Sequence, residues 1–407
     1  MDRIEALLAA VDWWDVEGGW PGGHTGPMAD VPEMVRDLWH ADFGRRLDAV
    51  SFLETAGFEY ADIRPATVLL VPVVVAVLAD PRSAGVWVYD SWDPELPLRA
   101  KLLELLGTAA KAPAWGGTDE ELRAKAAAVA AGAEDLPGPD LIAGYEAPER
   151  LGVRALAGEM LGDLLPYVDD PEVRVAHAAM FAVTRFAQLL QPEVRGAAAD
   201  GAAAEQVAAA VQRLLSVAGR GDGVVSVSGA AAYALAELGA DTVSLLGHPS
   251  LVARACAALS ASTAGDARAV AALEEALRYT PDNDRWLHPG SSLQQRLRLH
   301  MKFAKVAGAR AGSFDELVPG AFVVAAPAAE STEAGWGPLL RVAFPPGWQD
   351  RPLTGNQREF LRRLVNDDHN WGERAKYTMP YFAEVGLPQD RDACRMLLVA
   401  AGNAGRP

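Results

Sequence analysis

The sequence predicts an all-α protein: a right-handed α-solenoid of HEAT-like helical hairpins, closed by a C-terminal helical cap. Half of the 407 residues are hydrophobic but only 7% are aromatic, so small apolar residues, above all alanine, supply most of the apolar content. Alanine favours helices over strands. Between recurring proline-containing turns, apolar residues return at steps of three or four, which marks one apolar face of a helix. Repeated helix pairs bury such faces by stacking.

Residues 1–40 are expected to form N-terminal capping helices. Within them, Asp12-Trp13-Trp14-Asp15 is the most concentrated aromatic and acidic element. Exposed aromatic side chains are frequent anchors in protein interfaces, so Trp13 and Trp14 are candidate contact residues. The alternative is that these indoles pack against the next repeat as part of the cap.

Residues 41–318 are expected to form the HEAT-like repeat array. Its repeated signal is a turn with proline, an apolar residue two places on and a nearby arginine. This signal predicts a helix that begins at the proline and is capped by the preceding residue. The prolines of three copies are 77 and 78 residues apart, which is about two units of a HEAT or armadillo repeat. The copies are Asp93-Pro94-Glu95-Leu96, Asp170-Pro171-Glu172-Val173 and His248-Pro249-Ser250-Leu251.

The most apolar stretch of the chain is residues 66–79, which contains Pro72. A membrane span needs ~20 apolar residues, so this shorter stretch predicts a buried helix. The first residues carry no recognisable export signal, and Cys256 and Cys394 stand singly, without a disulfide or zinc pattern. We therefore expect no membrane contact and a reducing, cytoplasmic location.

An aromatic insertion interrupts the array at residues 87–92, where Trp87, Tyr89 and Trp92 alternate with other residues. Alternating aromatic side chains outside the helical pattern predict a loop. Such a loop either projects toward a partner or packs as an ordered connection. The three aromatic residues are therefore candidate binding residues.

The end of the array is marked by a change in composition. Residues 319–352 are rich in Gly, Pro, Ser and Trp and are expected to form a Pro/Gly-rich loop or small insertion. Helix signals resume in residues 353–407, where Thr354 is expected to cap a helix. This block is expected to be the C-terminal helical cap, whose polar outer face a solenoid needs for solubility.

The charge of the chain favours some partners over others. There are 37 Lys and Arg residues against 54 Asp and Glu residues, a net charge of −17. Such a charge repels phosphate backbones and anionic membranes, so nucleic acid is an unfavoured partner and a basic protein is favoured. One basic stretch opposes the average, because Arg298, Lys302 and Lys305 fall on one face of a predicted helix. Arg298 and Lys302 are candidate contacts for DNA, and a solvated helix face is the alternative.

No sequence motif for catalysis or for cofactor binding stands out. The seven histidines form no HExxH or HxxxH pair, and the glycine-rich residues 219–223 lack the strand and the GK[ST] of a phosphate loop. The cluster Asp367-Asp368-His369 has the residue types of an acid–base pair or a partial metal site. No second motif supplies further ligands, so we expect no cofactor and no metal.

Four segments occur in a set order along the chain. They are Val11-Asp12-Trp13, DVPEMVRDLWHAD, the Val71-Pro72 helix leading into VVAVLADP, and LTGNQREFLRRLVNDD followed by VGLPQDRDACRMLL. In this order they resemble a family of actinobacterial HEAT-repeat proteins of the PBS-lyase HEAT-like or armadillo type. A His-Gln-Gly element frequent in that family is replaced here by GFEYADIRPAT. The resemblance covers most of the chain and implies an α-solenoid with a binding surface and no catalytic residues.

These observations favour a non-catalytic scaffold that binds a protein partner on a concave, acidic face. Two alternatives stay open. A HEAT-fold enzyme acting on DNA bases, like a glycosylase, or on a small molecule would need a deep pocket with converging polar groups. An immunity or protective protein that sequesters a toxin would need a broad acidic concavity.

Overall fold

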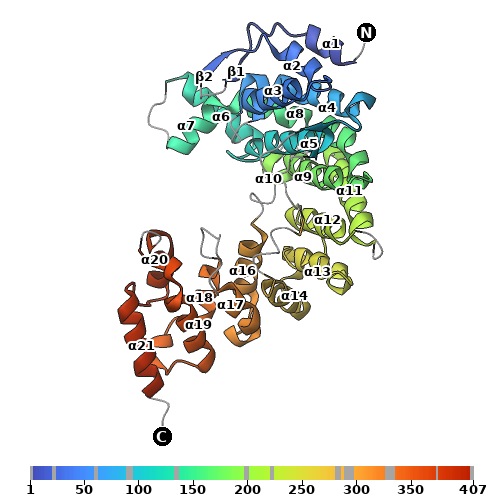
Figure 1. Ribbon diagram of the computed structural model, residues 1–407. Coiled ribbons are helices and arrows are strands. Elements are labelled where there is room, and N and C mark those ends of the chain that lie inside the picture. The colour runs from blue at the N-terminus through green and yellow to red at the C-terminus, as the bar shows by residue number, and fades with distance from the viewer. Residues whose placement is uncertain are drawn as a thin grey trace. The chain divides into compact units, whose positions relative to one another are not determined.

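The computed structural model describes residues 3–20, 24–58, 63–88, 95–132, 137–196, 201–220, 224–279, 286–287, 298–325, 335–372 and 375–403. Helices supply nearly all of the regular structure in these ranges, and the described strands form two short antiparallel pairs. The all-α prediction is confirmed. The chain divides into two compact units, residues 1–220 and residues 221–407, apart from the short segment 290–292 (Figure 1).

The N-terminal unit consists of helices and two short strand pairs. Its first half contains α1 (Arg3–Ala9), β1 (Glu17–Trp20), β2 (His24–Pro27), α2 (Val31–Asp37), α3 (Phe43–Leu53), a π-helical turn (Glu54–Phe58), α4 (Pro65–Ala79), β3 (Trp87–Val88) and β4 (Leu96–Pro97). Its second half contains α5 (Leu98–Ala109), α6 (Asp119–Ala130), α7 (Gly138–Tyr145), α8 (Ala147–Leu164), the 3-10 helix η5 (Leu165–Asp169), α9 (Val173–Leu189), α10 (Pro192–Arg195) and α11 (Gly201–Ala218).

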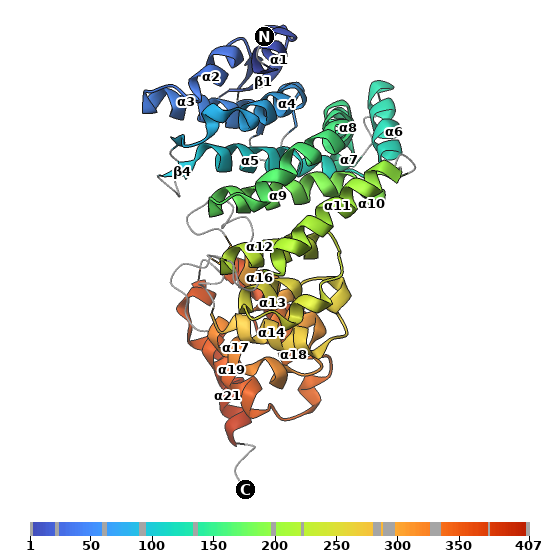
Figure 2. The same cartoon turned by 90° about the vertical axis from the view of Figure 1, so that its right-hand side faces the viewer.

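The core of this unit is a stack of long helices. In Figure 2, α4, α5 and α9 follow one another, and each packs on the next. Most side chains of α4 are buried, including the run Val73–Leu78, so the prediction of a buried helix at residues 66–79 is confirmed. The hydroxyl of Tyr167 in η5 donates to Leu78 O at 3.0 Å and fixes the end of α4. No helix among the described residues is long and apolar enough to cross a membrane.

Helix α11 has little side-chain volume to pack, because seven of its 18 residues are alanine. Two ion pairs hold the helix in place. The Asp169 carboxylate at the end of η5 forms ion pairs with Arg213 of α11 and with Arg220 just beyond it, the second at 2.7 Å. One carboxylate thus holds two arginines that are seven residues apart.

The C-terminal unit is also helical. It contains α12 (Val225–Glu237), α13 (Leu251–Ala257), α14 (Ala267–Leu277), α16 (Leu299–Arg310), the 3-10 helix η10 (Phe314–Leu317), α17 (Val318–Val324), α18 (Gly337–Ala343), the 3-10 helix η11 (Trp348–Asp350), α19 (Gly355–Asn366), the 3-10 helix η12 (Asp368–Asn370), α20 (Ala375–Glu384) and α21 (Arg391–Asn403).

From α14 onward these helices pack in two rows. One row runs α16, α18, α20 and the other α17, α19, α21, and each helix contacts the next in its own row (Figure 1). Helix α14 contacts the first member of both rows. This is the packing expected of stacked helical hairpins. The right-handed, HEAT-like solenoid over the whole chain stays a prediction.

The helix starts differ from the predicted arrangement by two residues. Helix α9 begins at Val173 rather than at Pro171, and Asp170 Oδ1 accepts the N–H of Glu172 at 2.9 Å. Likewise α13 begins at Leu251, and His248 Nδ1 accepts the N–H of Ser250 at 3.0 Å. The residue before the proline closes a turn in front of the helix, because proline disfavours the helical conformation of that residue. The copy at Asp93-Pro94 lies outside the described residues.

The same turn occurs without proline at residues 40–42. His40 Nδ1 accepts the N–H of Asp42 at 3.0 Å, and Arg46 Nη1 donates to the carbonyls of His40 and Ala41. Around His248, Arg254 Nη1 makes the two corresponding bonds at 3.0 Å. The nearby arginine therefore holds the turn at His40 and at His248. At Asp170 it does not, because Arg174 Nη1 donates to Glu95 O at 2.7 Å.

The prediction of a loop at residues 319–352 is wrong, because this range contains helices. Helices α17 and α18 lie in and at the edge of this range, each with a proline in its first turn. Proline is well tolerated there because the first N–H groups of a helix have no partner within it. The segment's Trp336 and Trp348 are buried. In the predicted cap, Thr354 does cap α19, and its hydroxyl accepts the N–H of Gln357 at 3.2 Å.

Candidate functional site

The two tryptophans near the N-terminus lie in opposite environments. Trp13 is 4% exposed, and its Nε1 donates to Leu8 O at 3.0 Å. Trp14 is 72% exposed, and only its backbone N–H is bound locally, to Asp12 Oδ1 at 3.1 Å. Trp13 is thus a core residue, in the position that the capping alternative describes, whereas Trp14 presents its indole at the surface.

Of the three aromatic residues predicted as contacts at 87–92, only Trp87 lies in the described part of the chain. Its side chain, in β3, is exposed, and the Arg174 guanidinium lies 5.0 Å from its ring centroid. Arg174 also pairs with Glu172 at the start of α9. Trp87 therefore contributes to local packing on α9 as well as to the surface. Tyr89 and Trp92 lie outside the described residues.

The two predicted basic contacts lie at the start of α16. Arg298 precedes its first residue and has a left-handed backbone with φ of 43°. Lys302 Nζ lies 3.0 Å from Glu237 Oε1 and contacts the hydroxyl of Tyr233, both on α12. Since Glu237 offsets the charge of Lys302, the two residues do not form an unopposed basic edge.

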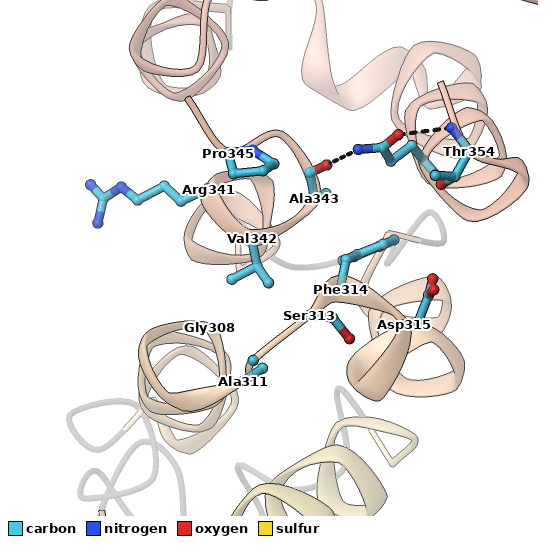
Figure 3. A pocket seen from close by; sticks show the side chains of 12 residues that line it. Gly308, Ala311, Ser313, Phe314, Asp315, Arg341, Val342, Ala343, Pro345 and Thr354 are labelled. Atoms are coloured by element: carbon cyan, nitrogen blue, oxygen red, sulfur yellow. Dashed lines mark hydrogen bonds between the residues drawn. The ribbon is translucent and has the colours of Figure 1, made fainter. Parts of the chain in front are cut away.

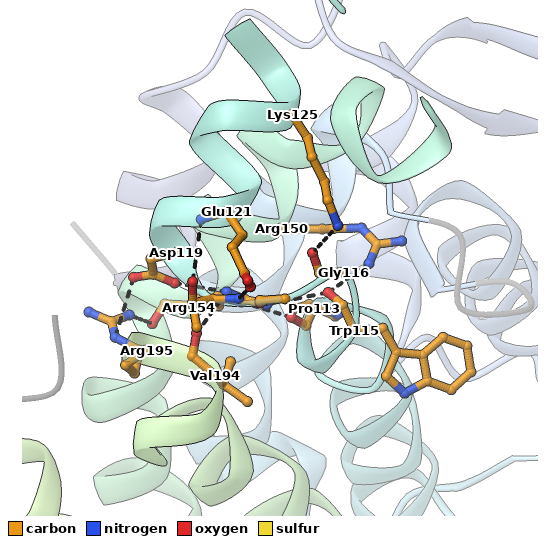
Figure 4. Close-up of polar contacts among 12 residues, drawn as sticks. Pro113, Trp115, Gly116, Asp119, Glu121, Lys125, Arg150, Arg154, Val194 and Arg195 are labelled. Carbon is orange, nitrogen blue, oxygen red and sulfur yellow. Dashed lines mark hydrogen bonds and ion pairs between the residues drawn. The ribbon is translucent and has the colours of Figure 1, made fainter. Parts of the chain in front are cut away.

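A site that the sequence analysis missed surrounds the loop between α5 and α6, residues 110–118. Arg154 of α8 is buried, and its guanidinium lies against this loop (Figure 4). Its Nε donates to Pro113 O at 2.7 Å and its Nη2 to Gly117 O at 2.8 Å. Its Nη1 donates to Asp119 Oδ1 at 2.9 Å, on the first residue of α6. One side chain thus joins the loop to two helices.

Two further cations hold the middle of the loop. Arg150, one turn before Arg154 on α8, donates from Nη1 to Trp115 O at 3.0 Å. Lys125 of α6 donates from Nζ to Gly116 O at 2.7 Å. Arg150 also binds the Glu146 carboxylate, at 3.0 Å from Nε. Arg150 Nη1 also donates to Ala112 O at 3.1 Å, so the carbonyls of five loop residues are bonded to buried or half-buried cationic side chains.

The backbone of the loop turns these carbonyls inward. Gly116 and Gly117 have φ of 93° and 100°, a region that side chains other than glycine rarely adopt. The indole of Trp115 points away from the polar network (Figure 4) and is 61% exposed. The loop therefore presents a large aromatic side chain on a backbone whose carbonyls are held by buried or half-buried cations. In the sequence, the only local signal is the Trp-Gly-Gly triplet, because Arg154 is 39 residues from Trp115.

Charge is unevenly divided between the two units. Residues 1–220 contain 18 Lys and Arg against 34 Asp and Glu, a net charge of −16, whereas residues 221–407 contain 19 against 20. Most of the exposed aromatic side chains of the described chain also lie in the N-terminal unit: Trp14, Phe43, Trp87, Trp115 and Tyr145. The acidic character and the aromatic surface thus coincide in one unit.

The C-terminal unit contains an open pocket of about 470 Å³. It lies between the ends of α16 and α18 and the start of α19 (Figure 3). Its two charged lining residues are already paired. Arg341 binds Glu384, with Nη2 2.8 Å from Oε2, and Asp315 Oδ1 accepts from Asn356 at 2.7 Å. The pocket therefore lacks the facing pair of titratable groups that acid–base chemistry uses.

The cluster at residues 367–369 serves the chain itself. Asp367 Oδ1 accepts the backbone N–H of His369 at 3.0 Å and caps η12, and Asp368 pairs with Arg391 at 2.6 Å. Across the described ranges, no group of three His, Cys, Asp or Glu side chains is placed to hold a metal ion.

Comparison with known proteins leaves the chain without an assigned family. No family model and no curated protein matches it. A crystal structure of an engineered protein aligns over 92% of this chain and 92% of its own, with 16% identity and a TM-score of 0.26. A TM-score this low supports no statement about fold or function.

Proposed function

We propose that the chain is a non-catalytic, HEAT-like scaffold of the cytoplasm that binds a basic protein through the acidic face of its N-terminal unit. We infer that this is the concave face of a right-handed solenoid. The observation that carries the proposal is the coincidence, within residues 1–220, of a net charge of −16 with most of the exposed aromatic side chains. Aromatic anchors supply binding energy, and charge supplies association rate and partner choice.

Two further features support a scaffold. The helices from α14 to α21 pack in two rows, as stacked repeats do, and stacked repeats form extended binding surfaces. The resemblance of four ordered segments to those of actinobacterial HEAT-repeat proteins is in keeping with the same proposed architecture. The ion pair of Lys302 with Glu237 weakens the alternative of a DNA-binding edge at α16.

The test is affinity capture with the tagged full-length chain from a lysate of its own cells. Nuclease treatment and high salt are applied in separate arms, and the retained proteins are identified by mass spectrometry. We expect one basic protein that survives nuclease treatment and is released by salt. An unrelated tagged protein of similar net charge is the control for simple ion exchange, and it should not retain that protein.

Other outcomes would overturn the proposal. Recovery of nucleic acid alone, released by salt, would favour the alternative of a glycosylase-like enzyme that acts on DNA bases. Turnover of a small molecule or excision of a base by the purified chain would exclude a purely non-catalytic role. A retained protein whose binding does not weaken with salt would contradict the role of the acidic unit.

A further inference from the structure

The loop that carries Trp115 has the properties of a preformed binding element. Its carbonyls are held by Arg154, Arg150 and Lys125 at 2.7 to 3.3 Å, so the backbone loses little freedom when a partner binds. Interfaces gain affinity from side chains that are ordered in advance, because less conformational entropy is lost on association. An indole that is exposed on such a backbone is the residue type most enriched among interface hot spots.

The loop packs against α7, which presents two more large exposed side chains. A Cβ at Gly116 would lie 3.3 Å from the Cβ of Ala143 in α7, which is tighter than most such contacts. Ile142 and Tyr145, on either side of Ala143 along α7, are both exposed. The loop and α7 are therefore neighbours, and their three large exposed side chains are together called the Trp115 face: Trp115, Ile142 and Tyr145.

The surroundings of the Trp115 face are acidic. Residues 110–132 and 137–151, which the structure describes, contain four Lys and Arg residues and six Asp and Glu residues. Lys125 pairs with Asp140 at 2.7 Å and Arg150 with Glu146, whereas Lys111 lies within the loop, near the Trp115 ring. Glu120 at the start of α6 is exposed, and no ion pair joins it to another described residue. The region has surplus negative charge around aromatic rings.

We propose that the Trp115 face docks a segment of a protein partner that is rich in arginine and lysine. Guanidinium and ammonium groups stack on Trp and Tyr rings, and the surrounding carboxylates attract the same cations. The ring of Trp115 already has one cation nearby, with Lys111 Nζ 5.9 Å from its centroid. This inference rests on the proposed scaffold function and names the surface and the partner segment.

The test uses the full-length chain and a fluorophore-labelled peptide of alternating arginine and leucine, with binding followed by fluorescence anisotropy. A peptide with glutamate in place of arginine is the chemical control. We expect the arginine peptide to bind and the glutamate peptide not to bind. Trp115→Ala should weaken binding about tenfold, as loss of a hot-spot aromatic residue does. Tyr145→Ala should weaken it as well.

The matched control is Tyr377→Ala, which removes an equally exposed tyrosine from α20 in the other unit. It should leave the affinity unchanged. Far-ultraviolet circular dichroism and unfolding midpoints establish that all three variants fold, which we expect because the substituted side chains are exposed. No binding of the arginine peptide by the unmodified chain, or equal binding by Trp115→Ala, would overturn the proposal.

Capture from the lysate separates failure of this inference from failure of the scaffold function. If the unmodified chain retains a basic protein and the Trp115→Ala, Tyr145→Ala double variant retains as much, docking occurs elsewhere and only the Trp115 face is excluded. If neither chain retains a protein, the scaffold function itself fails.

Discussion

Arg154 shows how one buried residue can organise a surface. Burial lowers the pKa of its guanidinium below the usual value, and the hydrogen bond to Asp119 offsets only part of this lowering. A buried charge is tolerated only when it is paired and its hydrogen bonds are satisfied. Arg154 meets this condition with Asp119 and with the carbonyls of Pro113, Gly117 and Val194, so the Trp115 loop depends on it.

Replacement of this arginine should therefore be costly. Arg154→Met leaves the Asp119 carboxylate buried with only Arg195, 3.5 Å away, as a cationic partner. We expect a loss of about 3 kcal/mol in the free energy of unfolding, the lower end of the range for breaking a buried pair. Denaturant unfolding measures it. The double variant Arg154→Met, Asp119→Leu should recover part of the loss. Equal instability of the double and single variants would show that the ion pair is not the cause.

The two cysteines are predicted to be chemically inert in the folded chain. Burial raises the pKa of Cys256 far above its usual value, and burial, with a smaller effect of Asp390, raises the pKa of Cys394 to about 11. At a pH well below these values both side chains are thiols, and only thiolates react quickly. A thiol-reactive dye at about pH 8, near the ordinary pKa of a free cysteine, should label neither residue in the native chain. After unfolding it should label both. Rapid labelling of the native chain would contradict this burial.

At the scale of the elements, the repeated feature is the hydrogen-bonded turn before the helix, as at α9 and α13. Asp170 and His248 perform the same function with different atoms, a carboxylate oxygen and an imidazole nitrogen. Residues of the Asp and Asn type commonly accept the N–H two residues on in this way. The repeat is therefore defined by this hydrogen-bond pattern more clearly than by the identity of the residue that accepts the bond.

This equivalence can be tested at position 248. His248→Asn keeps an acceptor for the Ser250 N–H, whereas His248→Ala removes it and leaves a small void. We expect His248→Ala to lose about 1 kcal/mol, the usual value of such a hydrogen bond, and His248→Asn to lose clearly less. The midpoints of urea unfolding give the comparison. Similar losses for both variants would indicate that ring packing, not the turn, is what His248 provides.

The sequence predicts an element well when residues close together in the chain determine it, and poorly when contacts from distant residues do. Residues 66–79 are apolar on every side, so their burial follows from composition, and Thr354 with Gln357 is a local capping pattern. The prolines of residues 319–352 predict a loop, although Pro319 and Pro338 lie in the first turns of α17 and α18. The Trp115 loop could not be predicted, because its geometry depends on Arg150 and Arg154, which are distant in sequence and carry no motif of their own.

On the scale of the whole molecule, the division of charge implies that the two units respond differently to salt. Excess like charge destabilises a compact unit by self-repulsion, and salt screens that repulsion. Raising the salt concentration should therefore stabilise residues 1–220, which carry −16, more than residues 221–407, which carry −1. Hydrogen exchange followed by peptide mapping reports each unit separately in the intact chain. An equal response of both units would contradict the prediction.

The pairing of Asp169 with Arg213 and Arg220 has a consequence for the alignment of α11. A helix whose surface is mostly methyl groups can slide along its neighbours with little change in shape complementarity, because adjacent turns look alike. A shift of one turn moves each residue by about 5.4 Å, which would carry at least one of the two guanidinium groups out of reach of the carboxylate. The ion pairs therefore favour one translational setting of this alanine-rich helix, together with the hydrogen bond from Gln206 Nε2 to Gly158 O at 3.3 Å.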